Sequence, residues 1–214
     1  MKPLVVALTG ASGAAYAVRL LQVLHRTGHD VHLAISPSAR LVIRQELAID
    51  IDLDAFEVDC LLNAKLPWES SESRKKKSDE ASGTIVYHRY DDYFAPIASG
   101  SFLTGGMVVC PCSGGTLSGI AHGSSTNLIQ RAADVHLKEH RKLILVPREA
   151  PLSIVHLDNM RRACEAGAVI LPASPGWYHG VRSIDDLVDF VVARILDQLG
   201  IEHSLIRRWS VEDE

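Results

Sequence analysis

Two polar turns in this chain carry side chains that could bind an anion and move a proton. One turn, 113–116 (SGGT), follows an apolar run at 108–110, and Arg148 and Glu149 follow a second apolar run at 143–146. Neither run alternates with polar residues, which is typical of parallel strands covered by helices on both faces. The hydroxyls, backbone N–H groups and guanidinium of these turns would then meet at the carboxyl edge of the sheet, where open α/β sheets bind ligands.

The N-terminal region predicts a third turn of this kind. Residues 4–8 form an apolar run, the turn 9–13 reads TGASG, and apolar residues then recur at helical spacing from Ala14 to Leu24. Glycine lets the backbone approach a ligand, and the unpaired N–H groups at a helix start can bind a phosphate. Many strand–helix connections use glycine simply to turn, so this motif alone does not establish a ligand.

The acidic residue of a dinucleotide site is missing from its expected place. NAD-binding folds carry a carboxylate at the end of the second strand. Here the predicted strand 31–35 ends in Ser36, and Asp30 precedes the strand at the opposite edge. A hydroxyl in that position favours a mononucleotide such as FMN.

Length and composition predict one soluble domain over 1–214. The chain is 47% hydrophobic, which is enough for one sizeable core, and its net charge of -4 argues against a nucleic-acid surface. No apolar run is long enough for a membrane span, and 1–10 is too short for a signal peptide, so we expect a cytoplasmic protein. The segment 69–83 has almost no apolar side chain, and we expect a flexible surface insertion there.

The remaining pattern alternates strands and helices and predicts an α/β fold with helices on both faces of a mostly parallel sheet. Helices are expected at 38–47, from Asn127, at 153–166 and from Ser183 to Leu199. Strands are expected at 84–87 and 168–171, and 50–68 reads as irregular chain.

The sulfur and imidazole groups give no strong metal pattern. The four cysteines lack CxxC spacing, and we expect reduced thiols packed in the core, at Cys60, Cys110, Cys112 and Cys164. His136 and His140 are one helical turn apart and could together bind zinc, but no third ligand is apparent.

Five motifs, in order and at compatible spacing, resemble those of the UbiX-type flavin prenyltransferases. They are GASGA at 10–14, PCSGGTLSGIAHG at 111–123, RAADVHLKE at 131–139, VPREAPL at 146–152 and PGWYH at 175–179. The resemblance covers nearly the whole chain and implies a three-layer, Rossmann-like (flavodoxin-like) fold and a homododecamer. It also implies synthesis of prenylated FMN from reduced FMN and dimethylallyl phosphate, for use by a UbiD-type decarboxylase.

The resemblance also assigns roles to residues. It implies that FMN is contacted by Gly10, Ala11, Ser12, Ser36, Ser113, Gly114, Gly115, Thr116 and Arg148. Dimethylallyl phosphate would be bound by Tyr178, Arg194, Arg131 and Lys138, the last two reaching the site of a neighbouring subunit. Glu46, Glu149 and Trp209 match positions close to the reacting groups, and Ser12 and Glu149 are candidates for proton movement.

The chemistry of this reaction agrees with these residue types. Departure of phosphate develops negative charge that arginine, lysine and tyrosine can stabilise, and a π face such as Trp209 can stabilise the allylic cation. No metal is then required. Many prenyl diphosphate enzymes hold magnesium by a DDxxD pattern, and this chain has one at 185–189. We interpret it as a helix start capped by Ser183, so substitution of Asp185 and Asp189 by asparagine should cost little stability.

Other interpretations stay open at this stage. Arg131 and Lys138, seven residues apart on one side of a helix, could simply form surface salt bridges with Asp134 and Glu139. Ser-Gly-Gly-Thr, Thr126 and Ala150 depart from residues that are frequent in the family. The alternative functions are a phosphopantothenoylcysteine decarboxylase, which would need a catalytic histidine and a clamping cysteine, and a non-enzymatic FMN carrier.

Overall fold

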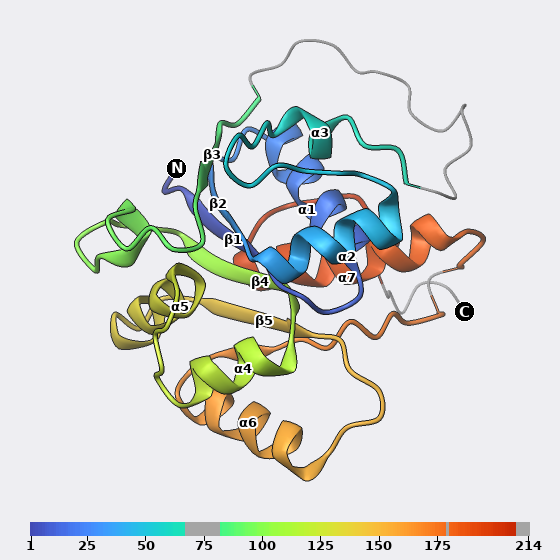
Figure 1. Ribbon diagram of the computed structural model, residues 1–214. Helices are drawn as coiled ribbons and strands as arrows, with labels where there is room; N and C mark the ends of the chain where they lie inside the picture. The colour runs from blue at the N-terminus through green and yellow to red at the C-terminus, as the bar shows by residue number, and fades with distance from the viewer. Residues whose placement is uncertain (67–81, 179, 209–214) are drawn as a thin grey trace.

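The computed structural model describes residues 1–66, 82–178 and 180–208, and within them six strands form one parallel sheet (Figure 1). The strands are β1 (Leu4–Leu8), β2 (Val31–Ile35), β3 (Ile85–His88), β4 (Gly106–Cys112), β5 (Leu143–Pro147) and β6 (Val169–Ile170). Their order is β3-β2-β1-β4-β5-β6, and every neighbouring pair is parallel. The predicted α/β class is confirmed.

Helices cover both faces of the sheet because successive side chains of each strand point to opposite faces. Leu4, Val6 and Leu8 of β1 pack in one core, whereas Val5 and Ala7 pack in the other. The first core is closed by α1 (Ala14–Arg26), α2 (Pro37–Leu47), α3 (Asp59–Leu62) and α7 (Ile184–Leu199). The second is closed by α4 (Gly114–Ala121), α5 (Leu128–Lys138) and α6 (Ile154–Glu165). A single 3₁₀ turn, η1 (Pro96–Ala98), precedes β4.

The strand order reverses direction between β1 and β4, which places the turns after these two strands side by side. The buried Thr9 joins them, because its hydroxyl donates to the Pro111 carbonyl at 2.7 Å and accepts from the Ser113 N–H at 2.8 Å. Ligands of open α/β sheets bind at such a switch point. The fold therefore brings the 9–13 and 113–116 turns together.

The predicted elements match the structure within a few residues, with two corrections and one expectation that lies mostly outside the described residues. The strand predicted at 108–110 extends over 106–112, because β4 pairs on both sides and continues through Pro111. The irregular stretch 50–68 contains the one-turn α3, whose Leu61 is buried. Of the insertion expected at 69–83, residues 69–81 lie outside the described residues, and Gly83 donates its N–H to the His25 carbonyl at 2.8 Å.

Core thiols are confirmed for Cys110 and Cys112 and wrong for Cys164. Cys110 and Cys112 are buried in β4, and burial raises the pKa of Cys112 to about 12. Cys164 is exposed, because it lies on the outer side of α6, and Cys60 is partly buried. No cysteine of the described part is in a disulfide.

The zinc alternative for His136 and His140 is not supported. His136 is buried, its Nδ1 donates to the Ala132 carbonyl at 2.7 Å, and its Nε2 lies 2.8 Å from the Thr104 hydroxyl. Both ring nitrogens are therefore occupied. Over residues 1–66, 82–178 and 180–208, no group of three or more potential ligands lies together. No helix of these residues is long and apolar enough to cross a membrane.

The DDxxD segment is a helix start, as predicted, although one of its carboxylates has a further role. Ser183 and Asp186 form a capping box. Asp189 forms a two-pronged ion pair with Arg19, at 2.6 Å to Nε and 2.9 Å to Nη2, with both side chains 17% exposed. This pair joins α7 to α1, so the expectation of little stability loss does not extend to Asp189.

We expect Asp189→Asn to lower the free energy of unfolding by about 1 to 3 kcal/mol, because it leaves a mostly buried guanidinium without its carboxylate. Asp185→Asn should cost about 0.5 kcal/mol, as expected for one carboxylate in a first helical turn. Urea denaturation of both variants measures the difference. Equal losses would show that the Arg19 pair contributes nothing beyond the helix start.

Candidate active site

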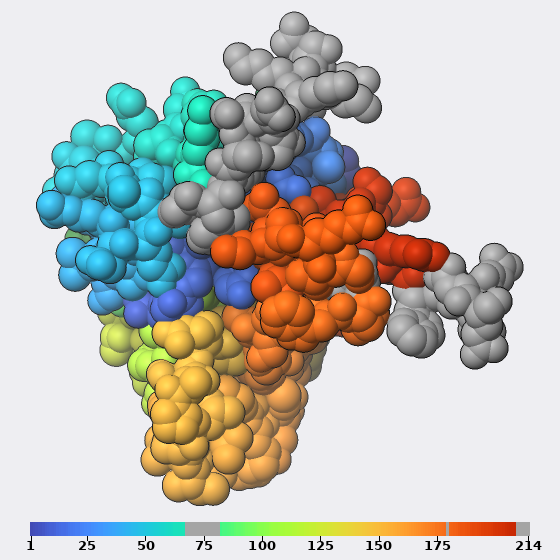
Figure 2. Space-filling model, turned by 90° about the vertical axis from the view of Figure 1, so that its right-hand side faces the viewer, coloured from blue at the N-terminus to red at the C-terminus, as the bar shows by residue number. Residues whose placement is uncertain are grey.

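Three loops meet at the carboxyl edge of the sheet. Figure 2 looks at this edge, where the dark blue N-terminal turn lies between the light blue α2 and the orange chain that leads into α7, above the golden loop that follows β5. Arg148 Nε lies 3.4 Å from the Ser12 carbonyl, which links the loop after β5 to the turn after β1. The structure thus brings together the turns that the sequence predicts to contact FMN.

The start of α4 has an open position at Gly115. The Ser113 hydroxyl caps the helix by accepting from the Thr116 N–H at 3.3 Å, and it donates to the Thr116 hydroxyl at 3.0 Å. A Cβ added at Gly115 would meet nothing within 4 Å. A ligand can therefore approach the first N–H groups of α4 closely, which is the geometry of a phosphate-binding helix start.

The glycines of the first turn have structural reasons of their own. A Cβ at Gly10 would lie 2.5 Å from the Ser38 Cβ, so Gly10 allows the turn to pack against the start of α2. Gly13 has φ 115°, which favours glycine, and a Cβ there would lie 2.9 Å from the Tyr16 ring. The resemblance implies that Gly10 contacts FMN, and packing against Ser38 is a second reason for glycine at this position.

The expectation of unpaired N–H groups at the start of α1 is wrong. Glu46 of α2 accepts from Gly13 N–H at 2.9 Å and from Ala14 N–H at 2.8 Å. A carboxylate thus occupies the position where the sequence suggests a ligand phosphate, and it compensates the positive end of the helix dipole. Glu46 is also half-buried, although a glutamate in its helical context is normally a solvated surface acid. Its carboxylate lies in the candidate site and is held by the turn after β1.

Ser36 and Ala11 lie close to this turn. The Ser36 hydroxyl caps α2 by accepting from Ala39 N–H at 3.1 Å, and Ser36 N–H donates to the Leu8 carbonyl. Ser36 and Ala11 are both buried, with exposed fractions of 6% and 7%. The serine that replaces the ribose carboxylate therefore keeps its O–H as a free donor, since the cap uses it only as an acceptor.

Tyr16 is a residue of this site that the sequence reasoning missed. Its ring packs against Gly13, and burial raises the pKa of its hydroxyl. The charges of Cys110 and Glu46 raise that pKa further, whereas Arg148 opposes them. The phenol therefore lies among a carboxylate and a guanidinium of the site. The only signal in the sequence was its place three residues after the glycine turn.

Tyr178, in the loop before α7, packs on the same helix that carries Arg194. The Tyr178 ring packs edge-on against Phe190, with ring centroids 5.8 Å apart. Phe190 and Arg194 are one helical turn apart and therefore share a face. Tyr178 is therefore linked through Phe190 to the helix face that carries Arg194.

Asp197 organises the positive charges at the end of α7. Its carboxylate receives hydrogen bonds from Arg194 at 2.7 Å, from Arg208 at 2.8 Å and from His203 at 3.0 Å. Burial alone would raise the pKa of Asp197, but the hydrogen bonds from Arg208 and His203 bring it below its ordinary value. One carboxylate thus faces two permanent cations, and the surplus positive charge suits an anionic ligand. Trp209, which follows Arg208 in the sequence, lies outside the described residues.

Arg131 and Lys138 are not brought to this edge by their own chain. Arg131 bonds to the Ala98 carbonyl and to Asp134, both at 3.0 Å, and Lys138 bonds to Glu139 at 2.8 Å. Lys138 also lies beside Gly100, in the segment that leads into the amino end of β4. Within one chain, the alternative of surface salt bridges is therefore the one observed.

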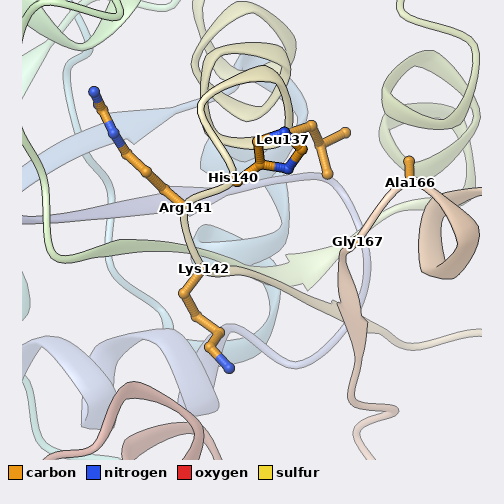
Figure 3. A pocket seen from close by; sticks show the side chains of 6 residues that line it. All are labelled: Leu137, His140, Arg141, Lys142, Ala166 and Gly167. Carbon is orange, nitrogen blue, oxygen red and sulfur yellow. The ribbon is translucent and has the colours of Figure 1, made fainter.

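A cavity of about 250 Å³ lies at the opposite edge of the sheet, at the start of β5 (Figure 3). It is lined by Leu137, His140, Arg141, Lys142, Ala166 and Gly167. The side chains of Arg141 and Lys142 leave it in opposite directions, and the Arg141 guanidinium donates to the Phe102 carbonyl at 2.7 Å. This cavity lies at the edge opposite to the turns described above and is not the candidate active site.

Comparisons with known proteins agree with this geometry. The model of the family described as Flavoprotein matches residues 1–196. The Pseudomonas aeruginosa protein named Flavin prenyltransferase UbiX is 50% identical, over 95% of this chain and 91% of the relative. The crystal structure of AnUbiX (PadA1) in complex with FMN and dimethylallyl pyrophosphate is 37% identical, with a TM-score of 0.80 over 98% of this chain and 97% of that chain.

A third relative is the crystal structure of a dodecameric FMN-dependent UbiX-like decarboxylase from Escherichia coli O157:H7. It is 40% identical, with a TM-score of 0.79, over 97% of this chain and 99% of that chain. Matches of this length and identity extend over every loop that forms the carboxyl edge of the sheet. The chain therefore belongs to the Flavoprotein family and, within it, to the UbiX flavin prenyltransferases.

Proposed function

We propose that this protein is a flavin prenyltransferase that joins the dimethylallyl group of dimethylallyl phosphate to N5 and C6 of reduced FMN. The proposal is supported by two separate sets of groups. The α4 start and Arg148 suit the flavin, and Tyr178, whose ring packs against Phe190 of α7, together with Arg194 one turn further along that helix suits a second anionic ligand. An FMN carrier would need only the first set.

FMN fits the first set of groups. The start of α4 offers N–H donors beside the open position at Gly115, and the hydroxyls of Ser113 and Thr116 add further polar contacts. Gly10, Ala11, Ser12, Ser36 and Gly114 complete the proposed flavin contacts. Since Glu46 already occupies the start of α1, we place the FMN phosphate at α4.

Dimethylallyl phosphate fits the second set. Its C–O bond breaks, and the leaving phosphate gains the negative charge that Arg194 and the Tyr178 hydroxyl can stabilise. N5 releases its proton as its new bond forms. Closure onto C6 consumes the double bond of the dimethylallyl group, which takes up one proton while C6 releases its own. Ser12, Glu46 and Glu149 are the residues proposed to move these protons, and Trp209 is the proposed π face beside the allylic group. These cationic and hydroxyl groups suffice for a monophosphate, so we propose that no metal takes part.

Arg131 and Lys138 enter the proposal through assembly. They lie far from the α4 start of their own chain, so they would serve the site of a neighbouring subunit. A homododecamer is the assembly that we propose. The amino-terminal half of α6 supports association, because large apolar side chains are exposed there at Leu152, Ile154, Val155 and Leu157.

The product and the compartment follow from the same chemistry. Prenylated FMN is proposed to serve a UbiD-type decarboxylase, which would receive it as a cofactor. We also propose a cytoplasmic location, because the free thiols of the described part and a reduced flavin substrate both suit a reducing compartment.

Anaerobic incubation with reduced FMN and dimethylallyl phosphate tests the proposal. Mass spectrometry of the released flavin should show the gain of one dimethylallyl unit, with or without EDTA, whereas reduced riboflavin should react much more slowly because it lacks the phosphate. Unchanged FMN, together with release of CO2 from phosphopantothenoylcysteine, would favour the decarboxylase alternative. A strict magnesium requirement would contradict the metal-free mechanism.

A further inference from the structure

We propose that Thr9 is a positioning residue for the FMN phosphate, because its hydroxyl holds Ser113, the N-cap of α4, where the first N–H groups of that helix can reach the phosphate. Thr9 is buried, with an exposed fraction of 1%, so it acts through Ser113 and not on the ligand itself. The inference rests on the proposed function, which places the FMN phosphate at the start of α4. It makes Thr9 a determinant of the preference for FMN over riboflavin.

The backbone of β4 leaves the regular sheet ladder just before α4. The register of β1 against β4 ends at the pair Ala7 and Val109, and the register of β4 against β5 shifts between Val109 and Cys112. Such an irregularity re-aims the chain and leaves backbone groups without ladder partners. The Pro111 carbonyl therefore needs a donor, and the Ser113 N–H needs an acceptor, from outside the ladder.

Thr9 supplies both partners from the end of β1. Its hydroxyl donates to the Pro111 carbonyl at 2.7 Å and accepts from the Ser113 N–H at 2.8 Å. The Thr9 N–H also donates to the Pro111 carbonyl, at 3.2 Å. A hydroxyl can donate and accept at once, which the methyl group of a valine cannot. One side chain thus fixes the two peptide groups on either side of Cys112.

Ser113 transmits this position to α4. Its carbonyl accepts from the Leu117 N–H at 2.9 Å, and its hydroxyl accepts from the Thr116 N–H at 3.3 Å. The first N–H groups of a helix have no acceptor within the helix. In the part of the chain that the structure describes, no group accepts from the N–H of Gly114 or Gly115, which leaves these two donors for the phosphate.

The segment that Thr9 holds also borders the loop after β5. Cys112 pairs with Pro147, and Arg148 follows, with its Nε 3.4 Å from the Ser12 carbonyl. Without the Thr9 hydroxyl, the start of α4 loses the bond that fixes it relative to these loops. Hydrogen bonds weaken steeply when their angle departs from linearity, so a displaced α4 start binds phosphate less tightly.

Two substitutions test the inference through the ratio of the dissociation constants of riboflavin and FMN. Thr9→Val removes the hydroxyl and keeps the shape of the side chain, and we expect it to lower this ratio by about tenfold, because only FMN has a phosphate to lose. Thr9→Ser keeps the hydroxyl and should keep the wild-type ratio. Titration of flavin fluorescence measures both constants without any prenyl transfer.

Thr104→Val is the matched control. Thr104 is also a buried threonine, and its hydroxyl lies 2.8 Å from His136 Nε2, before the amino end of β4. Its loss should lower the melting temperature as Thr9→Val does and leave the ratio unchanged. A wild-type ratio in folded Thr9→Val, or an equal fall in Thr104→Val, would overturn the inference and leave the proposed function intact. Equal affinities of the wild type for the two flavins would overturn the placement of the phosphate and the role of Thr9 with it.

Amide hydrogen exchange of the wild-type protein is a second test, which does not depend on the folding of a variant. Mass spectrometry with fragmentation to single residues should show slow exchange at Ser113 with or without FMN, because Thr9 accepts its proton. The Gly115 amide should exchange fast until FMN is added. Fast exchange at Ser113 in the folded protein would refute the role of Thr9. A Gly115 amide that FMN does not protect would instead refute the phosphate placement on which that role depends.

Discussion

Arg194→Ala is expected to lower kcat by about 10²- to 10³-fold, because it removes one of the cations that we propose to stabilise the leaving phosphate. The variant should still fold, since the Arg194 side chain is 45% exposed and its ion pair with Asp197 is shared with Arg208 and His203. It should also bind FMN normally, because Arg194 lies on α7 and not at the α4 start. Single-turnover rates and a flavin titration measure the two effects separately.

Arg161→Ala is the matched control for this prediction. Arg161 is also a helical arginine in surface ion pairs, with Asp158 and Glu165, and it is 59% exposed. Its loss should leave both kcat and FMN affinity unchanged. If folded Arg194→Ala is purified without flavin and cannot be reloaded, Arg194 binds the flavin phosphate and not the prenyl donor.

The fold and the location of the site could be predicted from the sequence because local patterns determine both. The uninterrupted apolar runs predicted parallel strands, and the turns at 113–116 and after β5 predicted the carboxyl edge. Ser183, interpreted from the sequence as a helix cap, caps α7 in the structure, because a side-chain oxygen that accepts from an N–H three residues later is a local interaction. Ser113, Asn127 and Ser153 cap their helices in the same way.

Contacts between distant segments could not be predicted in this way. Glu46 looks like a surface acid on its own helix, and only the approach of α2 to the turn after β1 makes it a cap for α1. Asp197 gave no signal, because its three partners come together only when residues 203–208 fold back along α7. For His136 and His140, helical spacing alone allowed a zinc pair that the sequence disfavoured for lack of a third ligand, and the fold buries His136 in hydrogen bonds.

Glu46→Gln is expected to lower kcat by about 10²- to 10⁴-fold while costing little stability, because the amide oxygen still accepts from the α1 start but cannot take a proton. Glu46→Ala should lose activity and, in addition, about 1 to 3 kcal/mol of unfolding free energy, since it leaves the half-buried N–H groups of Gly13 and Ala14 without a partner. Single-turnover rates and urea denaturation of the two variants separate the chemical role of the carboxylate from its capping role.

The control is Glu57→Gln, at an exposed glutamate between α2 and α3, which should change neither quantity. If Glu46→Gln keeps full activity and Glu46→Ala loses only stability, the carboxylate is a helix cap and nothing more. Proton acceptance in the reaction would then fall to Ser12 and Glu149. If Glu46→Gln is instead inactive with wild-type stability, the same carboxylate both compensates the helix dipole of α1 and accepts a proton. Such a double role is possible because the turn that Glu46 caps also carries Ser12, a proposed flavin contact.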